Sequence, residues 1–257
     1  VKQFTEEREL TVIIMVDASA SLNFGSREQM KVSDAAWLAA LIGFSAIGNQ
    51  DRVGLLAFTE QADDQAPEET MLFVPPKKGR SHGLRIVRDV LAFEAWGERR
   101  IAARRAAPRP DSRTRLEHAL SFLNRVTKRR VVVFLISDFR ATGYEQALAI
   151  THQRHDVIPI VVHDPGEDTL LGAGLTYVED AETGVVFPTF VSRRAQARHA
   201  LAAARFRAEL QRRFLRYGMQ AIVLPSAPPA GVHRYETRAD RFAKALVNYF
   251  RLRAKRR

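Results

Sequence analysis

Three oxygen-bearing side chains stand at alternate positions near the start of the chain. They belong to the run Asp17-Ala18-Ser19-Ala20-Ser21, which directly follows the apolar residues 10–16. One carboxylate and two hydroxyls are hard oxygen donors, which favour Mg²⁺, Mn²⁺ or Ca²⁺ over softer metals. The spacing therefore indicates a Mg²⁺-type site, and a simple turn with a helix cap is the alternative use of the same residues.

The strands and helices next to this run determine which other side chains could bind the same ion. Residues 10–16 are apolar on both faces and rich in β-branched side chains, which predicts a central parallel strand covered by helices. A second such run, residues 131–137, ends at Asp138, and Thr114 is predicted to open a helix over 114–126. Since ligands bind at the carboxyl ends of strands in open α/β sheets, Thr114 and Asp138 are expected at the same rim as Asp17.

This ordered set resembles the metal-ion-dependent adhesion site of von Willebrand factor A domains, and all five family positions are filled: Asp17, Ser19, Ser21, Thr114 and Asp138. The resemblance implies that the three hydroxyls bind the ion directly or nearly so, while the two carboxylates act through water and orient the hydroxyls. Neutral direct ligands leave a divalent ion under-neutralised, so a Glu or Asp of a partner protein is the natural sixth ligand. Arg113 departs from the small residue that family members often carry before the Thr.

Further motifs resemble one bacterial branch of these domains, the MoxR-associated family, or domain of unknown function 58. They are Glu6-Glu7-Arg8-Glu9, Asp51-Arg52-Val53-Gly54-Leu55, Ile136-Ser137-Asp138-Phe139, Arg154-His155-Asp156-Val157, Asp164-Pro165-x-Glu167 and Glu179-Asp180-x-Glu182-Thr183-Gly184. The resemblance implies a protein-binding domain that works with a MoxR-type AAA+ ATPase in assembling client proteins or inserting metal into them.

Length and composition fit one α/β core. The chain has 257 residues, of which 46% are hydrophobic, and a single domain over 1–257 is expected. Cysteine is absent, which excludes disulfides, thiol catalysis and cysteine-ligated zinc and fits a reducing compartment. The sequence shows neither a signal-peptide pattern nor a transmembrane-length apolar run, so a cytoplasmic location is predicted. Membrane association, through residues preceding Val1 or the basic C-terminus, is the alternative.

The charge is strongly positive, +11, from 40 Lys and Arg against 29 Asp and Glu. Arginines crowd residues 99–115, and a second basic group occupies 251–257. Such runs indicate an acidic partner, nucleic acid or an anionic membrane, and a solvated arginine-rich surface is the plain alternative. Nucleic acid is disfavoured, because the first cluster has no interleaved aromatic residues and the sequence has no known nucleic-acid motif.

The remaining periodicities alternate between strand and helix. Helices are predicted over 29–47, 84–96, 143–152, 192–217 and 238–253, and strands over 53–59, 71–74, 157–162 and 219–224. Residues 174–190 are predicted to form an inserted β-hairpin, and 192–257 a helix, strand and helix that complete the fold. The whole predicts a doubly wound, mostly parallel sheet with helices on both faces.

A catalytic function is the main alternative to protein binding. A strand-terminal Asp beside Mg²⁺ also serves phosphatase-like hydrolases, but their general acid lies two residues on, and Ser19 cannot act as an acid at neutral pH. Nucleophile-elbow, zinc-protease and phosphate-loop motifs are absent from the sequence. A non-catalytic domain is therefore predicted. The alternatives are a Mg²⁺-dependent hydrolase and a basic scaffold that binds nucleic acid or membrane.

Overall fold

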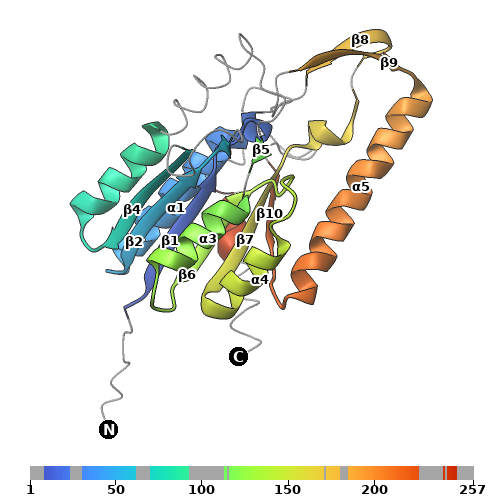
Figure 1. Ribbon diagram of the computed structural model, residues 1–257. Coiled ribbons are helices and arrows are strands. Elements are labelled where there is room, and N and C mark those ends of the chain that lie inside the picture. Colours follow the sequence, from blue (N-terminus) through green and yellow to red (C-terminus); the bar gives the residue numbers. More distant parts are fainter. Residues whose placement is uncertain are drawn as a thin grey trace.

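One twisted sheet organises the molecule (Figure 1). The computed structural model describes residues 9–23, 31–61, 70–92, 113–114, 116–170, 172–179, 185–225, 240 and 242–247. Six strands lie in the order β10-β7-β6-β1-β2-β4, and all neighbours are parallel except the antiparallel pair β2–β4. Their bounds are β1 Thr11–Asp17, β2 Arg52–Phe58, β4 Met71–Lys77, β6 Val132–Ser137, β7 Asp156–His163 and β10 Ile222–Pro225.

Strand β1 supplies both cores of the protein. Its side chains alternate across the sheet, so that Ile14 and Val16 face one hydrophobic cluster while Ile13 and Met15 face the other. All four are almost completely buried. A strand that is covered on both sides needs apolar residues at every position, which explains the continuous apolar run in the sequence.

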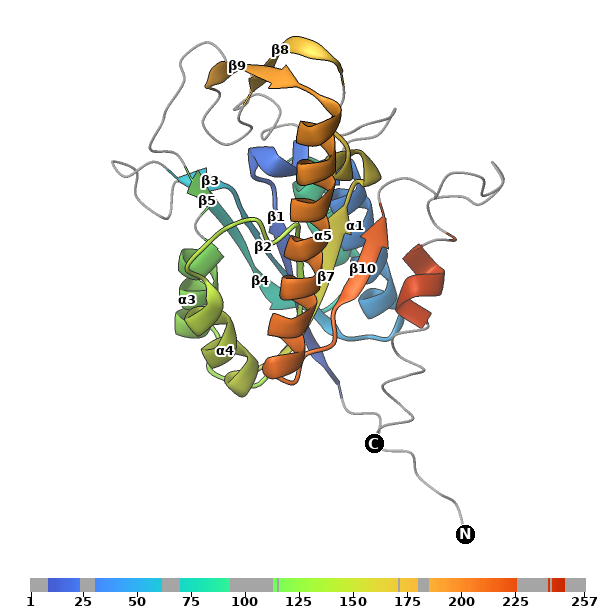
Figure 2. The ribbon, with the colours of Figure 1, turned by 90° about the vertical axis from the view of Figure 1, so that its right-hand side faces the viewer.

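Helices cover the two faces unequally (Figure 2). Helix α1, Lys31–Gly48, packs on one face together with the helical residues 80–92 and 242–247. The other face carries α3, Leu116–Val126, α4, Glu145–Arg154, and α5, Arg193–Arg216. The predicted doubly wound architecture with helices on both faces is confirmed.

Helix α1 is also the one helix of the described residues that is long and apolar enough to cross a membrane. Ten of its residues are buried within the protein, where Leu38 and Ile42 belong to the core. Its apolar composition is therefore accounted for by packing against β1 and its neighbours.

Strand β4 does not end where the sequence predicted. It runs past Pro75 and Pro76 to Lys77, three residues beyond the predicted end at residue 74. Strand β4 lies at the edge of the sheet, where prolines are tolerated because an edge strand can leave amide positions unpaired on its outer side. The pairing register with β2 also shifts between Val53 and Leu55, opposite the prolines.

The predicted hairpin is confirmed as a separate two-stranded sheet. Strand β8, Gly174–Glu179, pairs antiparallel with β9, Val186–Val191. Helix α5 follows at once, with Ser192 capping it by accepting a hydrogen bond from the Ala195 amide. The helix ends before Gly218, whose φ of 73° is in the left-handed region, as expected for a helix-ending glycine.

The prediction that Thr114 opens a helix is wrong. Thr114 lies in the two-residue strand β5, Arg113–Thr114, which pairs with β3, Glu60–Gln61, and α3 begins at Leu116. Helix α4 likewise begins later than predicted, because Gly143 has a φ of 81° that no helix accommodates. The basic residues at 99–112 and 251–257 lie outside the described residues.

Candidate metal site

Asp17 is fixed by its own loop and by the neighbouring strand. It ends β1, and its Oδ1 accepts a hydrogen bond from the Ser19 amide at 2.9 Å. Its Oδ2 accepts one from the Ser137 hydroxyl at 2.7 Å, and Ser137 is the last residue of the adjacent β6. Both carboxylate oxygens are thus used to hold the loop, which suits a residue that orients ligands.

The two serines of the motif are brought together. Ser19 and Ser21 are buried, and their Oγ atoms lie 3.1 Å apart. The short 3-10 turn η1, Ala20–Asn23, produces this closeness by folding the chain back after β1. Two neighbouring ligands of an octahedral Mg²⁺ lie about 3 Å apart, so the pair has the separation that a shared ion requires.

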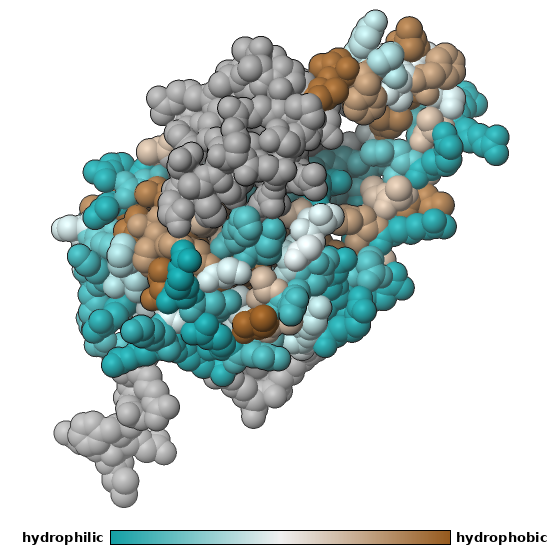
Figure 3. Space-filling model, viewed as in Figure 1, coloured by the Kyte–Doolittle hydropathy of each residue, from teal (hydrophilic) through white to brown (hydrophobic). Residues whose placement is uncertain are grey.

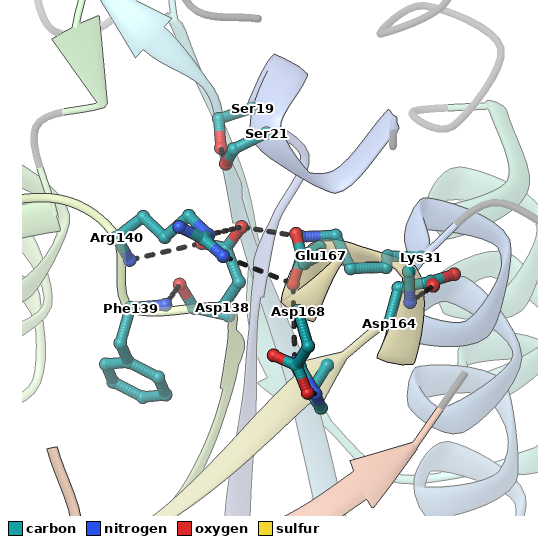
Figure 4. A network of polar contacts seen from close by, with 12 residues as sticks. Ser19, Ser21, Lys31, Asp138, Phe139, Arg140, Asp164, Glu167 and Asp168 are labelled. Carbon is teal, nitrogen blue, oxygen red and sulfur yellow. Dashed lines mark hydrogen bonds and ion pairs between the residues drawn. The ribbon is translucent and has the colours of Figure 1, made fainter. Parts of the chain in front are cut away.

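Asp138 lies at the same rim but already has a cation beside it. Lys31 Nζ is 2.8 Å from Asp138 Oδ2 and 2.6 Å from Glu167 Oε1. Glu167 belongs to the 3-10 turn η3, Pro165–Asp168, after β7. Figure 4 shows Ser19 and Ser21 on one side of this ion-pair cluster, with Arg140 approaching Glu167 Oε2 at 3.4 Å.

The charged side chains of Lys31, Asp138 and Glu167 in this ion-pair cluster are almost completely buried. Lys31 is inaccessible to solvent, and the side chains of Asp138 and Glu167 are 4% and 9% exposed. Burial opposes the charge of Lys31, but the two carboxylates outweigh it and raise the pKa of Lys31. Burial also opposes ionisation of Glu167, yet His163, Lys31 and Arg140 lower its pKa to about 2. Both partners are therefore charged at neutral pH.

The pKa of Asp17 changes in the opposite direction from that of Glu167. Burial and the negative charge of Asp138 raise the pKa of Asp17 to about 7, although Ser19 and Ser137 donate hydrogen bonds to it. Three acidic residues, Asp17, Asp138 and Glu167, thus share a buried region in which Lys31 is the buried cation. A divalent cation beside the two serines would favour the ionised form of Asp17, so the donor set fits a Mg²⁺-type ion.

The backbone of Thr114 is at the correct end of the sheet. Thr114 pairs with Glu60, which follows the end of β2, and Phe58 of β2 pairs with Asp17. The Thr59 hydroxyl donates to the carbonyl of Ala18 at 3.3 Å, which ties this segment to the loop after β1. The side chain of Thr114 lies outside the described residues, so its role as a ligand stays a prediction.

The sequence did not reveal Lys31 and Glu167 as part of the site. Asp164-Pro165-x-Glu167 was used as a motif of the family resemblance, and in the structure Asp164 caps η3 by accepting a hydrogen bond from the Gly166 amide at 2.6 Å. The same turn directs Glu167 toward Lys31. A lysine directly before the apolar stretch of α1 is a weak signal, because most such lysines reach solvent.

Within the described ranges, no group of three or more His, Asp or Glu side chains could hold a metal ion together. The predicted set differs from such a group because three of its five members are hydroxyl residues: Ser19, Ser21 and Thr114. An ion there would depend on hydroxyl oxygens, water and an outside ligand. The five residues remain a predicted metal site, of which the structure brings four side chains to one rim.

The sheet order and the helices on both faces define a doubly wound α/β protein with a mostly parallel sheet. Residues 1–211 match the family described as protein of unknown function DUF58, and the chain belongs to this family. Proteins of Mycobacterium tuberculosis and Mycobacterium bovis, both named as uncharacterized, are 32% identical over 213 residues. The match covers 82% of this chain but 61% of each relative, so the chain spans about three fifths of their length.

Solved structures show weaker similarity. BatB from Bacteroides thetaiotaomicron matches with a TM-score of 0.42 and 16% identity, over 81% of this chain and 98% of that one. The SpRpn10 VWA domain matches with a TM-score of 0.40 and 8% identity, over 94% and 95%. The fold class rests on the order and direction of the strands themselves.

Proposed function

We propose that this chain is a non-catalytic, metal-dependent protein-binding domain, and that it works in the cytoplasm with a MoxR-type AAA+ ATPase on a client protein. The observation that supports the proposal is the arrangement of Asp17, Ser19 and Ser21. The carboxylate is held by two hydrogen bonds, and the two hydroxyls stand 3.1 Å apart in front of it.

The charges around the site favour an acidic partner. Ser19, Ser21 and Thr114 are neutral ligands, and Lys31 already takes part of the charge of Asp138. An ion held in this way keeps most of its positive charge and has room for one more oxygen. A Glu or Asp side chain of the partner or its client would complete the coordination with a strong Coulomb gain.

A hydrolytic function finds less support at the same residues. Position 19 carries a serine hydroxyl, and the ionised Glu167 is engaged by Lys31. A general acid must hold a proton near neutral pH, and the low pKa of Glu167 prevents that. ATP use is assigned to the AAA+ partner.

Metal binding is tested directly by titration calorimetry with Mg²⁺ and Mn²⁺. Asp17→Ala is expected to abolish binding, because the alanine leaves the Ser19 amide and the Ser137 hydroxyl without the acceptor that orients the loop. Asp89→Ala is the control, since this carboxylate pairs with the exposed Arg85 and Arg88 and lies outside the candidate site. Equal affinities of wild type and Asp17→Ala would remove the metal site.

Partner binding is tested by capture of the MoxR-type AAA+ protein of the same organism in Mg²⁺ and in EDTA. Capture is expected in Mg²⁺ only, and Thr114→Ala is expected to lose it while stability falls by no more than about 1–2 kcal/mol. Thr127→Ala serves as the control, because this residue lies beyond the end of α3. Undiminished capture in EDTA would show that the metal site is not the contact.

A further inference from the structure

The hairpin carries an apolar face that none of the described residues covers. Side chains opposite one another in an antiparallel pair share a face, as do alternate residues along one strand. The register pairs Leu175 with Phe190 and Tyr177 with Pro188, which places these four on one side together with Val186. Leu175, Tyr177 and Phe190 are 69%, 73% and 69% exposed. We call these five residues the open face.

The opposite side of the hairpin faces the protein. Val191 is buried there, Thr176, Val178 and Thr189 are half-buried, and Phe187 is 46% exposed. The hairpin is thus anchored through one side and presents the other. Figure 3 shows apolar side chains gathered on the hairpin at one end of the molecule. A contiguous exposed patch of this kind is typical of an interaction surface.

Free positive charge adjoins the open face. Arg193, Arg194 and Arg198 lie in the first two turns of α5, which begins two residues after β9. All three are exposed, and none forms an ion pair with another described residue. The amino end of α5 adds its own partial positive charge. The start of α5, next to the end of β9, therefore attracts carboxylates.

The same segment is tied to the candidate metal site. Gln196 of α5 donates hydrogen bonds to the carbonyls of Leu170 and Gly172, at 3.2 and 3.1 Å. His199 Nε2 lies 2.8 Å from the carbonyl oxygen of Glu167, the residue that pairs with Lys31. Figures 1 and 2 both place the hairpin beyond the carboxyl end of the sheet, where β1 ends. The hairpin and the candidate metal site therefore lie at the same end of the sheet.

We propose that the open face and these three arginines are the second contact surface for the partner protein, and that they bind an acidic segment with apolar side chains. The proposal rests on the proposed function in that the same partner supplies the carboxylate for the metal. Apolar side chains of the segment cover Leu175, Tyr177 and Phe190, while its carboxylates form ion pairs with the three arginines at the start of α5. One carboxylate on a metal carries little specificity, and this second contact provides it.

The area of the open face argues against a second copy of this chain as its occupant. Five such side chains offer on the order of 500 Å² per protomer, below the roughly 800 Å² per partner of a stable interface, so a second copy would be held weakly by this face alone. An anionic membrane is the other occupant that three free arginines could attract, and the vesicle measurement below distinguishes it from an acidic segment.

The test uses a synthetic peptide of about twelve residues in which Leu alternates with Glu, long enough to span both strands. Fluorescence anisotropy is measured in EDTA, so that the result does not depend on the metal site. The wild type is expected to bind the peptide at low salt. The variant Tyr177→Ser/Phe190→Ser and the variant Arg194→Gln/Arg198→Gln are each expected to bind at least about tenfold more weakly. A peptide with Lys in place of Glu is expected not to bind.

Two matched controls lie at the far end of α5. Leu215→Ser removes an exposed apolar side chain and Arg212→Gln an exposed guanidinium, and both are expected to keep wild-type affinity. Equal binding by wild type and the Tyr177→Ser/Phe190→Ser variant would overturn the proposal. It would also be overturned if that variant lost self-association in sedimentation, or lost binding to phosphatidylserine vesicles, while peptide binding was unchanged. Loss of metal binding by Asp17→Ala is a separate result and leaves this outcome unaffected.

Discussion

Asp17 and Asp138 illustrate how two carboxylates of one motif come to differ. Asp17 accepts hydrogen bonds from Ser19 and Ser137 but has no cationic side chain against it in the described residues. Asp138 is 2.8 Å from the ammonium of Lys31. The first therefore depends on an outside cation for its charge, whereas the second is compensated from within. In the proposed metal site, this asymmetry would leave Asp17 to the divalent ion while Lys31 compensates Asp138 with or without it.

Lys31 gives the first prediction at this scale. Lys31→Met keeps the length and apolar stem of the side chain but removes the charge, which leaves Asp138 and Glu167 buried without their shared cation. The loss of one partner from a buried ion pair costs about 3–5 kcal/mol. Urea unfolding followed by circular dichroism is expected to show this decrease, and adding Glu167→Gln to the variant is expected to recover part of it.

The control is an arginine that itself lies at the surface. Arg88 is 73% exposed and pairs with Asp89 at 2.7 Å, so Arg88→Met is expected to change stability by no more than about 1 kcal/mol. If Lys31→Met were as mild as Arg88→Met, the buried cluster would not be held by its charges.

Residue types and their order were sufficient to predict that Asp17 and Asp138 lie at the same end of the sheet, whereas their role in a metal site stays a prediction. Asp17 and Asp138 end buried apolar strands, and a strand end in a parallel sheet has a defined place. Lys31 could not be found in this way. Its burial depends on Glu167, which is 136 positions away in the sequence. Only the crossing of β7 beside α1 brings the two together.

At the scale of the elements, continuous apolar runs in the sequence predicted the buried strands correctly, but not the residues at which the strands begin and end. Residues 10–16 and 131–137 are strands displaced by about one position, because the pairing partners and not the side chains set the ends. Thr114 was misplaced since a short strand such as β5 has no periodicity of its own. It exists through its pairing with Glu60 and Gln61, and such pairing is not visible in sequence.

Gly54 gives a prediction at the scale of the sheet. A Cβ atom on this residue of β2 would lie 2.9 Å from the carbonyl oxygen of Val74 and 3.0 Å from the nitrogen of Pro76. Both are backbone atoms of β4, so the edge strand would have to move. Gly54→Ala is expected to destabilise the protein by about 1–3 kcal/mol in urea unfolding.

Gly48 is the natural comparison, because a Cβ atom there has no neighbour within 4 Å in the described structure. It is the last residue of α1, and Gly48→Ala is expected to be neutral or to stabilise the protein by up to about 1 kcal/mol. If the two variants were equal, the close approach of β4 to β2 would not be what requires glycine at position 54.

At the scale of the whole molecule, both cores depend on the same strands. Ile14 and Val16 belong to the cluster under α1, and Ile13 and Met15 to the cluster under α3 and α4. The late strand β10 pairs with β7, and Phe242 packs in the first cluster, so the C-terminal part of the chain closes the core that the N-terminal part begins. Neither face can unfold without exposing the other side of β1.

The chain is therefore expected to unfold in a single cooperative transition, as predicted for one domain over 1–257. Far-ultraviolet and near-ultraviolet circular dichroism should give coincident thermal curves, because secondary structure and side-chain packing are lost together. The hairpin is separate from the main sheet, since β8 and β9 form a sheet of their own. Tyr177→Ser is accordingly expected to leave the midpoint within about 2 °C of wild type, since the side chain is mostly exposed. Two separated transitions, or a proteolytic fragment that remains folded without β10, would show that the two faces are independent units.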